Sequence, residues 1–578
     1  MSRAVPFSSN RLLEVKLPAY RSRLLMLLIA LAFLALAGRA VYLQTMTTEF
    51  LQRQGEVRYG RTIELSASRG KVLDRNGLVL ASSLPARAVW AVPEDVKDAT
   101  PAQLGELARM LDLPEREVRK RLADEEKTFV YLKRQVPTEV ADRIRELEIP
   151  GVHQRKEYKR HYPQAEALAH VVGFTNVEDV GQEGIELAQQ KVLAGRPGSR
   201  RVIRDGRGRT IENRGLIQEP RDGRDIQLSI DSKIQYHAFA ALRDAVAAHR
   251  AKAGAVVVLD VRTGEVLALA NLPTYDPNQR GQLSGAQLRN RVITDTFEPG
   301  STLKPFTTVL ALESGRVTPQ TVIDTAPGRM TIGGRTIGDA HPHGALTVEE
   351  VLQKSSNVGT AKLALAMPPQ KMWELFTAAG FGQAPQIGFP GAVAGRVRPY
   401  KSWKPIEQAT MSYGHGISLS LIQLARGYTM FARDGDVVPL TMLKADEPAR
   451  GVPVASAKSA AAVRRMLEMA AGPGGTAPLA QVPGYRVAGK TGTALKLEGG
   501  RYVKRYIANF VGFAPVSDPR LVVAVMIDEP SAGKYYGGQV AAPVFSRIVG
   551  DALRTLRVAP DAPLTGQIIP AEPVRESM

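Results

Sequence analysis

The 578-residue chain contains no cysteine, which excludes disulfide bonds, thiolate metal sites and a cysteine nucleophile. This absence leaves the redox compartment of the protein open. Acidic residues are also scarce, since 57 Asp and Glu stand against 76 Lys and Arg, for a formal net charge of +19. Such an excess of positive charge predicts an acidic partner: a nucleic acid, an anionic lipid or an acidic polymer.

Two familiar catalytic signatures are missing as well. The chain has no G-x-S-x-G nucleophile elbow, and His341 and His343 lack the i, i+4 spacing of helical metal ligands. We therefore interpret His341, His343 and His415 as loop residues rather than as metal ligands or members of a catalytic triad. The content of 44% hydrophobic and 23% charged residues is typical of an ordered protein. Its length predicts roughly two to four domains.

The N-terminal region predicts a membrane anchor. Residues 24–43 are apolar apart from Gly38, Arg39 and Tyr42, and twenty helical residues span about 30 Å. Because the preceding segment is basic, we expect a cytoplasmic tail over 1–23, an anchor over 24–45 and an exported remainder. A cleaved signal peptide is the alternative, since Ala35-Leu36-Ala37 resembles a cleavage site. Export in either form argues against a nucleic-acid partner.

A charge-rich region follows, and we assign residues 46–225 to an elongated pedestal domain. Asn76-Gly77 predicts a hairpin turn, and the spacing over 102–148 predicts two amphipathic helices. The arginine-dense stretch 196–224 is interpreted as a solvated hairpin surface, with a dock for anionic wall or lipid headgroups as the alternative.

The pattern changes at residue 226, where a second domain is expected to extend to 558. A helix over 232–249, a strand hairpin over 255–269 and further strands near 486–493, 507–513 and 521–527 indicate an α+β fold. We expect one antiparallel sheet packed with helices, and a disordered proline-containing tail over 559–578.

Three short motifs in this domain carry candidate chemistry. Ser301 and Lys304 form an S-x-x-K string, which a Pro-Gly break and Pro305 place at a helix N-terminus with both side chains on one face. A lysine can activate a serine nucleophile when burial or a nearby cation makes it a base. An ordinary helix start is the alternative, and it is the better interpretation of S-x-x-K taken alone.

The second motif is Ser355-Ser356-Asn357, after a helix that a capping box at Thr347 begins and that should run to about Lys354. Ser355 and Asn357 are placed to relay a proton and to hold an amide. Capping of the following helix is the alternative, and it is the better interpretation of this motif taken alone.

The third motif is Lys490-Thr491-Gly492-Thr493, on a strand where Gly492 would let a peptide backbone approach. It also satisfies the P-loop string from Gly484 to Thr491, but no strand precedes that glycine and no helix follows the lysine, so we reject an NTPase.

Together and in this order, the three motifs resemble the active-site motifs of penicillin-binding transpeptidases. The resemblance extends to residues 69–77, 160–163, 181–186, 255–273 and 413–425, which are similar to class B, monofunctional penicillin-binding proteins. It covers nearly the whole chain from the anchor to about residue 550. The setting of residues 352–359 is most similar to that of the septal, cell-division enzyme.

The resemblance implies a penicillin-binding transpeptidase domain and a serine acyl-enzyme mechanism. It implies that Ser301 is the nucleophile, Lys304 its base, and Ser355, Asn357 and Lys490 catalytic partners. Thr491, Gly492 and Thr493 would bind the substrate, with the backbone N–H groups of Ser301 and Thr493 as the oxyanion hole. The implied ligands are peptidoglycan stem pentapeptides and β-lactam antibiotics, and no cofactor is implied.

The same resemblance implies a single-pass protein of the bacterial inner membrane, with its catalytic domain in the periplasm. Its partners would be a septal glycosyltransferase and other division proteins. An elongation-specific transpeptidase and a non-catalytic division scaffold are the two alternative hypotheses.

Overall fold

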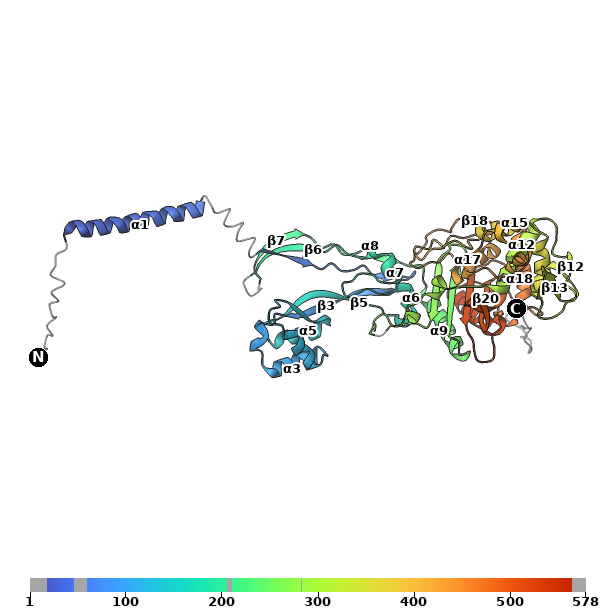
Figure 1. Ribbon diagram of the computed structural model, residues 1–578, viewed down its shortest axis with the longest axis horizontal. Helices are drawn as coiled ribbons and strands as arrows, with labels where there is room; N and C mark the ends of the chain where they lie inside the picture. Colours follow the sequence, from blue (N-terminus) through green and yellow to red (C-terminus); the bar gives the residue numbers. More distant parts are fainter. Residues whose placement is uncertain (1–17, 46–59, 205–209, 282, 564–578) are drawn as a thin grey trace. The chain divides into compact units, whose positions relative to one another are not determined.

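The computed structural model describes residues 18–45, 60–204, 210–281 and 283–563 (Figure 1). The chain divides into two units, one formed by residues 1–67 and 196–221 and the other by 68–195 and 222–578. The first unit contains helix α1 (Ala19–Thr45), which is long and apolar enough to cross a membrane, with a mean hydropathy of 2.5 in its most apolar window. The apolar helix expected from the sequence is thereby confirmed, and it begins five residues before the expected anchor.

The first unit also holds a three-stranded antiparallel sheet. Its strands are β1 (Gly60–Leu65), β6 (Gly198–Arg204) and β7 (Thr210–Gln218), in the order β1-β6-β7. The hairpin predicted for the arginine-dense stretch is confirmed in its two strands, whereas the residues that join them lie outside the described part of the chain.

The second unit begins with a twisted sheet built around β3 (Val79–Ala91). This strand pairs with β2 (Val72–Leu73), β4 (Val130–Pro137) and β5 (Val152–His161), and the Asn76-Gly77 turn between β2 and β3 is confirmed. Three helices cover it instead of the two that we predicted: α3 (Pro101–Met110), α4 (Glu115–Leu122) and α5 (Thr138–Glu146). The prediction was wrong because β4, rich in β-branched and aromatic residues, interrupts the helical spacing.

After the short helix α6 (Ala169–Val172), a buried ion network fastens this sheet to helices α7 (Gly184–Ala188) and α8 (Gln190–Leu193). The carboxylate of Glu186 accepts from Arg69 Nε at 2.6 Å and from Arg160 Nε at 2.7 Å. Both arginines also donate to backbone carbonyls, so all three charges are compensated away from water.

The larger part of the second unit is built on a five-stranded antiparallel sheet in the order β10-β9-β21-β20-β19. The strands are β9 (Ala253–Asp260), β10 (Val266–Leu272), β19 (Ala488–Glu498), β20 (Arg501–Ala514) and β21 (Leu521–Asp528). Strand β9 shows how both faces are covered, because Val256 and Val258 join one hydrophobic cluster while Val257 and Leu259 join the other. The α+β prediction is confirmed.

Helices α9 (Ser232–Ala248) and α20 (Ala542–Thr555) lie on one face of this sheet, with α17 (Leu421–Ala432) and α18 (Ala457–Ala471) on the other. Further helices of this domain are α10 (Gly285–Leu288), α11 (Arg291–Thr294), α15 (Pro369–Ala378), α16 (Pro405–Met411) and α19 (Gly537–Val540). Strand β8 (Ile226–Gln227) pairs with β2. The two-stranded ladders are β11 (Thr296–Phe297) with β16 (Leu419–Ser420), β12 (Val322–Asp324) with β15 (Ala345–Thr347), β13 (Arg329–Ile332) with β14 (Arg335–Gly338), and β17 (Asp436–Val437) with β18 (Val452–Pro453).

The C-terminal segment continues past α20 along the surface of this domain. Asp561 accepts hydrogen bonds from the backbone of Arg486 at 2.7 Å and from the hydroxyl of Ser517 at 2.8 Å. The beginning of the segment that we expected to be disordered is thus held by specific contacts, and residues 564–578 lie outside the described part.

Candidate active site

Ser301 lies in a single 3-10 turn (Gly300–Leu303) that leads directly into α12 (Lys304–Glu313). The sequence predicted a helix start here, and the structure refines it: the serine precedes the α-helix, in a tighter turn. Gly300 has φ +60°, a conformation that favours glycine, and the hydroxyl of Tyr428 donates to the carbonyl of Thr302 at 2.7 Å. Ser301 is 6% exposed, so a fixed and nearly buried turn presents its hydroxyl.

Lys304 is completely buried, and its amino group reaches the second motif. Its Nζ donates to the backbone carbonyl of Ser355 and lies 3.0 Å from Ser355 Oγ. Ser355 has φ +62°, which is strained for a residue other than glycine, and it occupies the corner between α13 (Val348–Gln353) and α14 (Asn357–Leu365). The Thr347 capping box and both helices agree with the prediction. The structure therefore brings the first two motifs into direct contact.

Asp339 organises the second motif, and the sequence analysis missed its role. Its carboxylate accepts from Ser356 Oγ at 2.7 Å and from the backbone N–H groups of Asn357 and Val358, so it caps the N-terminus of α14. Asn357 Nδ2 donates to the carbonyl of Gly338 at 3.0 Å. No local sequence signal pairs Asp339 with α14, because β15 and α13 separate them in the sequence.

The third motif lies within β19, and this strand continues to Glu498, which agrees with our rejection of a P-loop. Lys490 is completely buried, with Nζ 3.3 Å from Thr491 Oγ1 and 3.4 Å from Thr476 Oγ1. The hydroxyls of Thr476 and Thr491 are 2.8 Å apart. A buried cation beside two hydroxyls is suited to bind a carboxylate. Thr476 is a member of this group that the motif search did not find.

The serine turn and β19 touch each other through their glycines. A methyl group added at Gly300 would lie 3.4 Å from the carbonyl oxygen of Thr493, and one added at Gly492 would lie 2.6 Å from that of Pro299. The backbone of Gly537 donates to Thr493 Oγ1 at 3.0 Å. The structure thus brings Ser301, Lys304 and Ser355 beside the strand that carries Lys490 and Thr491–Thr493.

Glu298, three residues before Ser301, anchors the loop that contains His415. Its carboxylate accepts from the backbone of Gly416 at 2.8 Å and from Tyr502 at 3.1 Å, and it lies 3.3 Å from His415 Nδ1. Burial acts to raise the pKa of Glu298, but the hydrogen bonds from His415 and Gly416 outweigh it and hold that pKa below its ordinary value. Glu298 is therefore ionised at neutral pH, and His415 has a structural partner that we did not predict.

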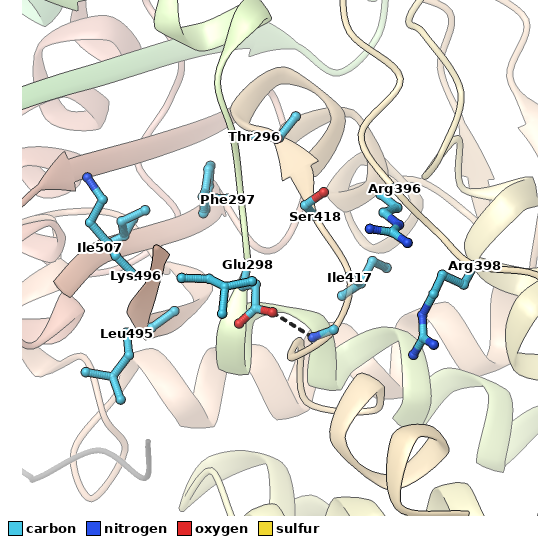
Figure 2. Close-up of a pocket in the computed structure, with 13 residues that line it drawn as sticks. Thr296, Phe297, Glu298, Arg396, Arg398, Ile417, Ser418, Leu495, Lys496 and Ile507 are labelled. Carbon is cyan, nitrogen blue, oxygen red and sulfur yellow. Dashed lines mark hydrogen bonds between the residues drawn. The ribbon is translucent and has the colours of Figure 1, made fainter. Parts of the chain in front are cut away.

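Beyond Glu298 a cavity of about 520 Å³ opens beside the end of β19 (Figure 2). Residues from Ala494 to Leu497 form one wall. Phe297 and Glu298, the loop 416–418 and two arginines, Arg396 and Arg398, form the rest.

Comparison with known proteins agrees with this geometry. The family described as penicillin binding protein transpeptidase domain matches residues 254–550, and the penicillin-binding protein dimerisation domain matches 64–228. The chain belongs to the class B penicillin-binding proteins. This is a family of serine acyl-transfer enzymes that act on peptidoglycan and bind β-lactams.

The chain matches curated relatives along nearly their full length. The chain is 43% identical to the probable peptidoglycan D,D-transpeptidase PenA of Neisseria gonorrhoeae, over 95% of each chain. It is also 43% identical to the peptidoglycan D,D-transpeptidase FtsI of Escherichia coli K12, over 93% of this chain and 92% of the relative.

Solved structures are similar as well. The transpeptidase domain of Burkholderia pseudomallei penicillin-binding protein 3 is 53% identical, with a TM-score of 0.54 over 58% of this chain and 98% of that one. A peptidoglycan synthetase of Bifidobacterium adolescentis is 25% identical, with a TM-score of 0.70 over 88% of this chain and 99% of that one.

Proposed function

We propose that this class B penicillin-binding protein cross-links peptidoglycan stem peptides at the division septum through an acyl-enzyme on Ser301. The contact between the buried Lys304 amino group and Ser355, one turn from Ser301 and beside β19, is the observation that carries the proposal. The E. coli relative is named peptidoglycan D,D-transpeptidase FtsI, and the name FtsI supports the division role.

In the proposed reaction Ser301 Oγ attacks the carbonyl of the penultimate D-alanine of a stem pentapeptide. Lys304, as a neutral amine, takes the hydroxyl proton, and this proton passes through Ser355 to the nitrogen of the departing D-alanine, while Asn357 positions the substrate amide. The backbone N–H groups of Ser301 and Thr493 stabilise the oxyanion, an effect worth a few kcal/mol at such sites. The amine of a neighbouring stem peptide then attacks the ester and releases Ser301.

Lys490 and the hydroxyls of Thr491 and Thr493 would hold the terminal carboxylate of the substrate. Their support is the buried position of Lys490 next to Thr476 and Thr491. A carboxylate there directs the rest of the peptide along β19, where Gly492 leaves room for its backbone. A β-lactam, which carries a carboxylate beside a strained amide, would acylate Ser301 in the same orientation.

For the whole protein we propose an inner-membrane location. Helix α1 would be a retained anchor with residues 1–23 in the cytoplasm, because these residues are basic. The catalytic domain would then lie in the periplasm, and its partners would be a septal glycosyltransferase and other division proteins.

The test is covalent labelling of the full-length protein in detergent with a fluorescent penicillin, followed by mass spectrometry of the adduct. We expect one adduct, on Ser301, and none in Ser301→Ala. A folded wild-type protein without an adduct would refute the acyl-enzyme and favour the scaffold hypothesis. A fluorescent fusion then distinguishes the septal role, which predicts signal at mid-cell, from an elongation role, which predicts signal along the side wall.

A further inference from the structure

A second cavity, of about 430 Å³, lies where helices α6 and α7 face the transpeptidase domain. Helices α10 and α11 and the turn 389–391 form its other wall. The volume is that of a small-molecule site. Apolar side chains supply much of the lining, namely Leu187, Leu288, Phe389 and Pro390. The few polar groups among them therefore decide which ligand fits.

His170 presents an unused hydrogen-bond acceptor to this cavity. Its side chain is buried, and Nε2 donates to the backbone carbonyl of Gln287 at 2.7 Å, which leaves a lone pair on Nδ1. Among the described residues Nδ1 has no hydrogen-bond partner, and it is not one of their fully enclosed polar atoms, so it faces the cavity that His170 lines. Burial lowers the pKa of His170 to about 4, so Nδ1 remains an acceptor at neutral pH.

Two more acceptors line the same cavity. The carboxylate of Glu183 makes no hydrogen bond or ion pair within the described part of the chain, and burial raises its pKa. The hydroxyl of Tyr275 donates to the carbonyl of Ala169 at 3.0 Å, so it can only accept from a ligand. The cavity thus offers three acceptors to a molecule that donates hydrogen bonds.

The charges around the cavity favour a neutral ligand. An anion would face the unpaired carboxylate of Glu183. A cation at His170 would be opposed by burial and by the charge of Arg291, which both lower the pKa of that histidine. Arg289, at the rim, is already paired with Asp295. A molecule rich in hydroxyl groups donates to the acceptors without bringing a charge, and the C–H face of a sugar ring packs well on apolar side chains.

The cavity adjoins the groove of the candidate active site. It lies between Thr294 and Pro390, while the larger cavity lies between Thr296 and Arg396, so the same two segments of the chain border both (Figure 2). Thr294 precedes Ser301 by seven residues, and an extended chain of that length spans at most about 25 Å. A stem peptide extended from the serine covers about 14 Å over four residues, and the glycan strand that carries it continues from there.

We propose that this cavity binds one sugar ring of the peptidoglycan glycan strand that carries the donor stem peptide. Ring hydroxyls would donate to Glu183 and to His170 Nδ1, and the apolar face of the ring would pack on Phe389 and Leu288. The inference rests on the proposed function for the choice of polymer, and it adds a subsite for the glycan.

The experiment measures binding of N,N′-diacetylchitobiose, a neutral disaccharide of N-acetylglucosamine, to the full-length protein in detergent by saturation-transfer NMR titration. We expect the wild type to bind it, and to bind it equally well after penicillin has acylated Ser301. Glu183→Ala removes a charge-assisted acceptor and should weaken binding about tenfold, whereas Glu183→Gln keeps an acceptor and should retain part of it. Glu166→Ala, which changes an exposed glutamate outside the cavity, is the matched control and should bind as the wild type does.

Absence of binding to the wild type would overturn the inference. Loss of binding on acylation of Ser301 would place the sugar in the active-site groove and overturn it too, as would a folded Glu183→Ala that binds as the wild type does. Tighter binding of putrescine, a diamine, than of the disaccharide would refute the argument for a neutral ligand. Failure of the proposed function is seen separately, as a wild type without an adduct on Ser301, because the titration does not depend on acylation.

Discussion

The contact between β19 and the serine turn is too close to accept a side chain at Gly492, so we expect Gly492→Ala to lower the acylation rate of the enzyme strongly. The added Cβ would lie 2.6 Å from the Pro299 carbonyl and 2.6 Å from Asn509 Oδ1, about 0.8 Å short of the 3.4 Å at which ordinary contact begins. The carbonyl is backbone and cannot rotate away. The strand and the turn must therefore separate, and Thr493 must move relative to Ser301.

The size of the effect follows from that displacement. A misplacement of about 1 Å between reacting groups costs roughly 100-fold in rate, and overpacking of a filled interior costs about 1–3 kcal/mol of stability. We expect the second-order rate constant for acylation by a fluorescent penicillin to fall by about 30- to 100-fold. The protein should remain folded, with a lowered melting temperature.

Gly344→Ala is the matched control. Gly344 also lies in the transpeptidase domain, but a methyl group there would meet nothing within 4 Å, and its φ is not in the left-handed region. Its acylation rate should equal that of the wild type. If a folded Gly492→Ala also acylated at the wild-type rate, the argument that close backbone approach positions Ser301 would be refuted.

Two further predictions concern charges. Glu186→Ala leaves two buried arginines without their carboxylate, so the free energy of unfolding should fall by about 3–5 kcal/mol in urea titrations. Glu106→Ala, which removes only an exposed ion pair, should change little, and equal effects would contradict the network argument. Burial raises the pKa of Glu298, but its hydrogen bonds lower this pKa by more, so it lies below the ordinary 4.5. The ionised carboxylate therefore stabilises the folded protein fully at neutral pH, and this stabilisation is lost as the pH falls below about 4.5. The melting temperatures of wild type and Glu298→Gln should converge in that acid range, and a gap that stays constant down to the acid limit would show that another group is responsible.

The sequence alone was sufficient for the local structure. The continuous apolar runs of β9 and β21, the Thr347 capping box and the Asn76-Gly77 turn each depend on neighbouring residues, and each element formed as expected. The prediction failed where strand pairing competes with helical spacing, because β4 pairs with β3, about 40 to 50 residues earlier in the chain.

The candidate site shows the same division. The three motifs were visible as strings, and the resemblance to a family supplied an order for them. Only the folded chain brings Lys304 to Ser355, Asp339 to the start of α14 and Thr476 to Lys490. These contacts join residues from separate elements, and no local pattern encodes them.

The cavity beyond Glu298 was also invisible in the sequence. Its charged residues, Glu298, Arg396, Arg398 and Lys496, come from three segments about a hundred residues apart, and an arginine in a loop carries no periodic or motif signal. Short-range chemistry therefore determined the helices, strands and motifs of this protein. The packing of distant segments decided which polar and charged groups meet in the candidate site, because contacts such as that of Lys304 with Ser355 join residues far apart in the sequence.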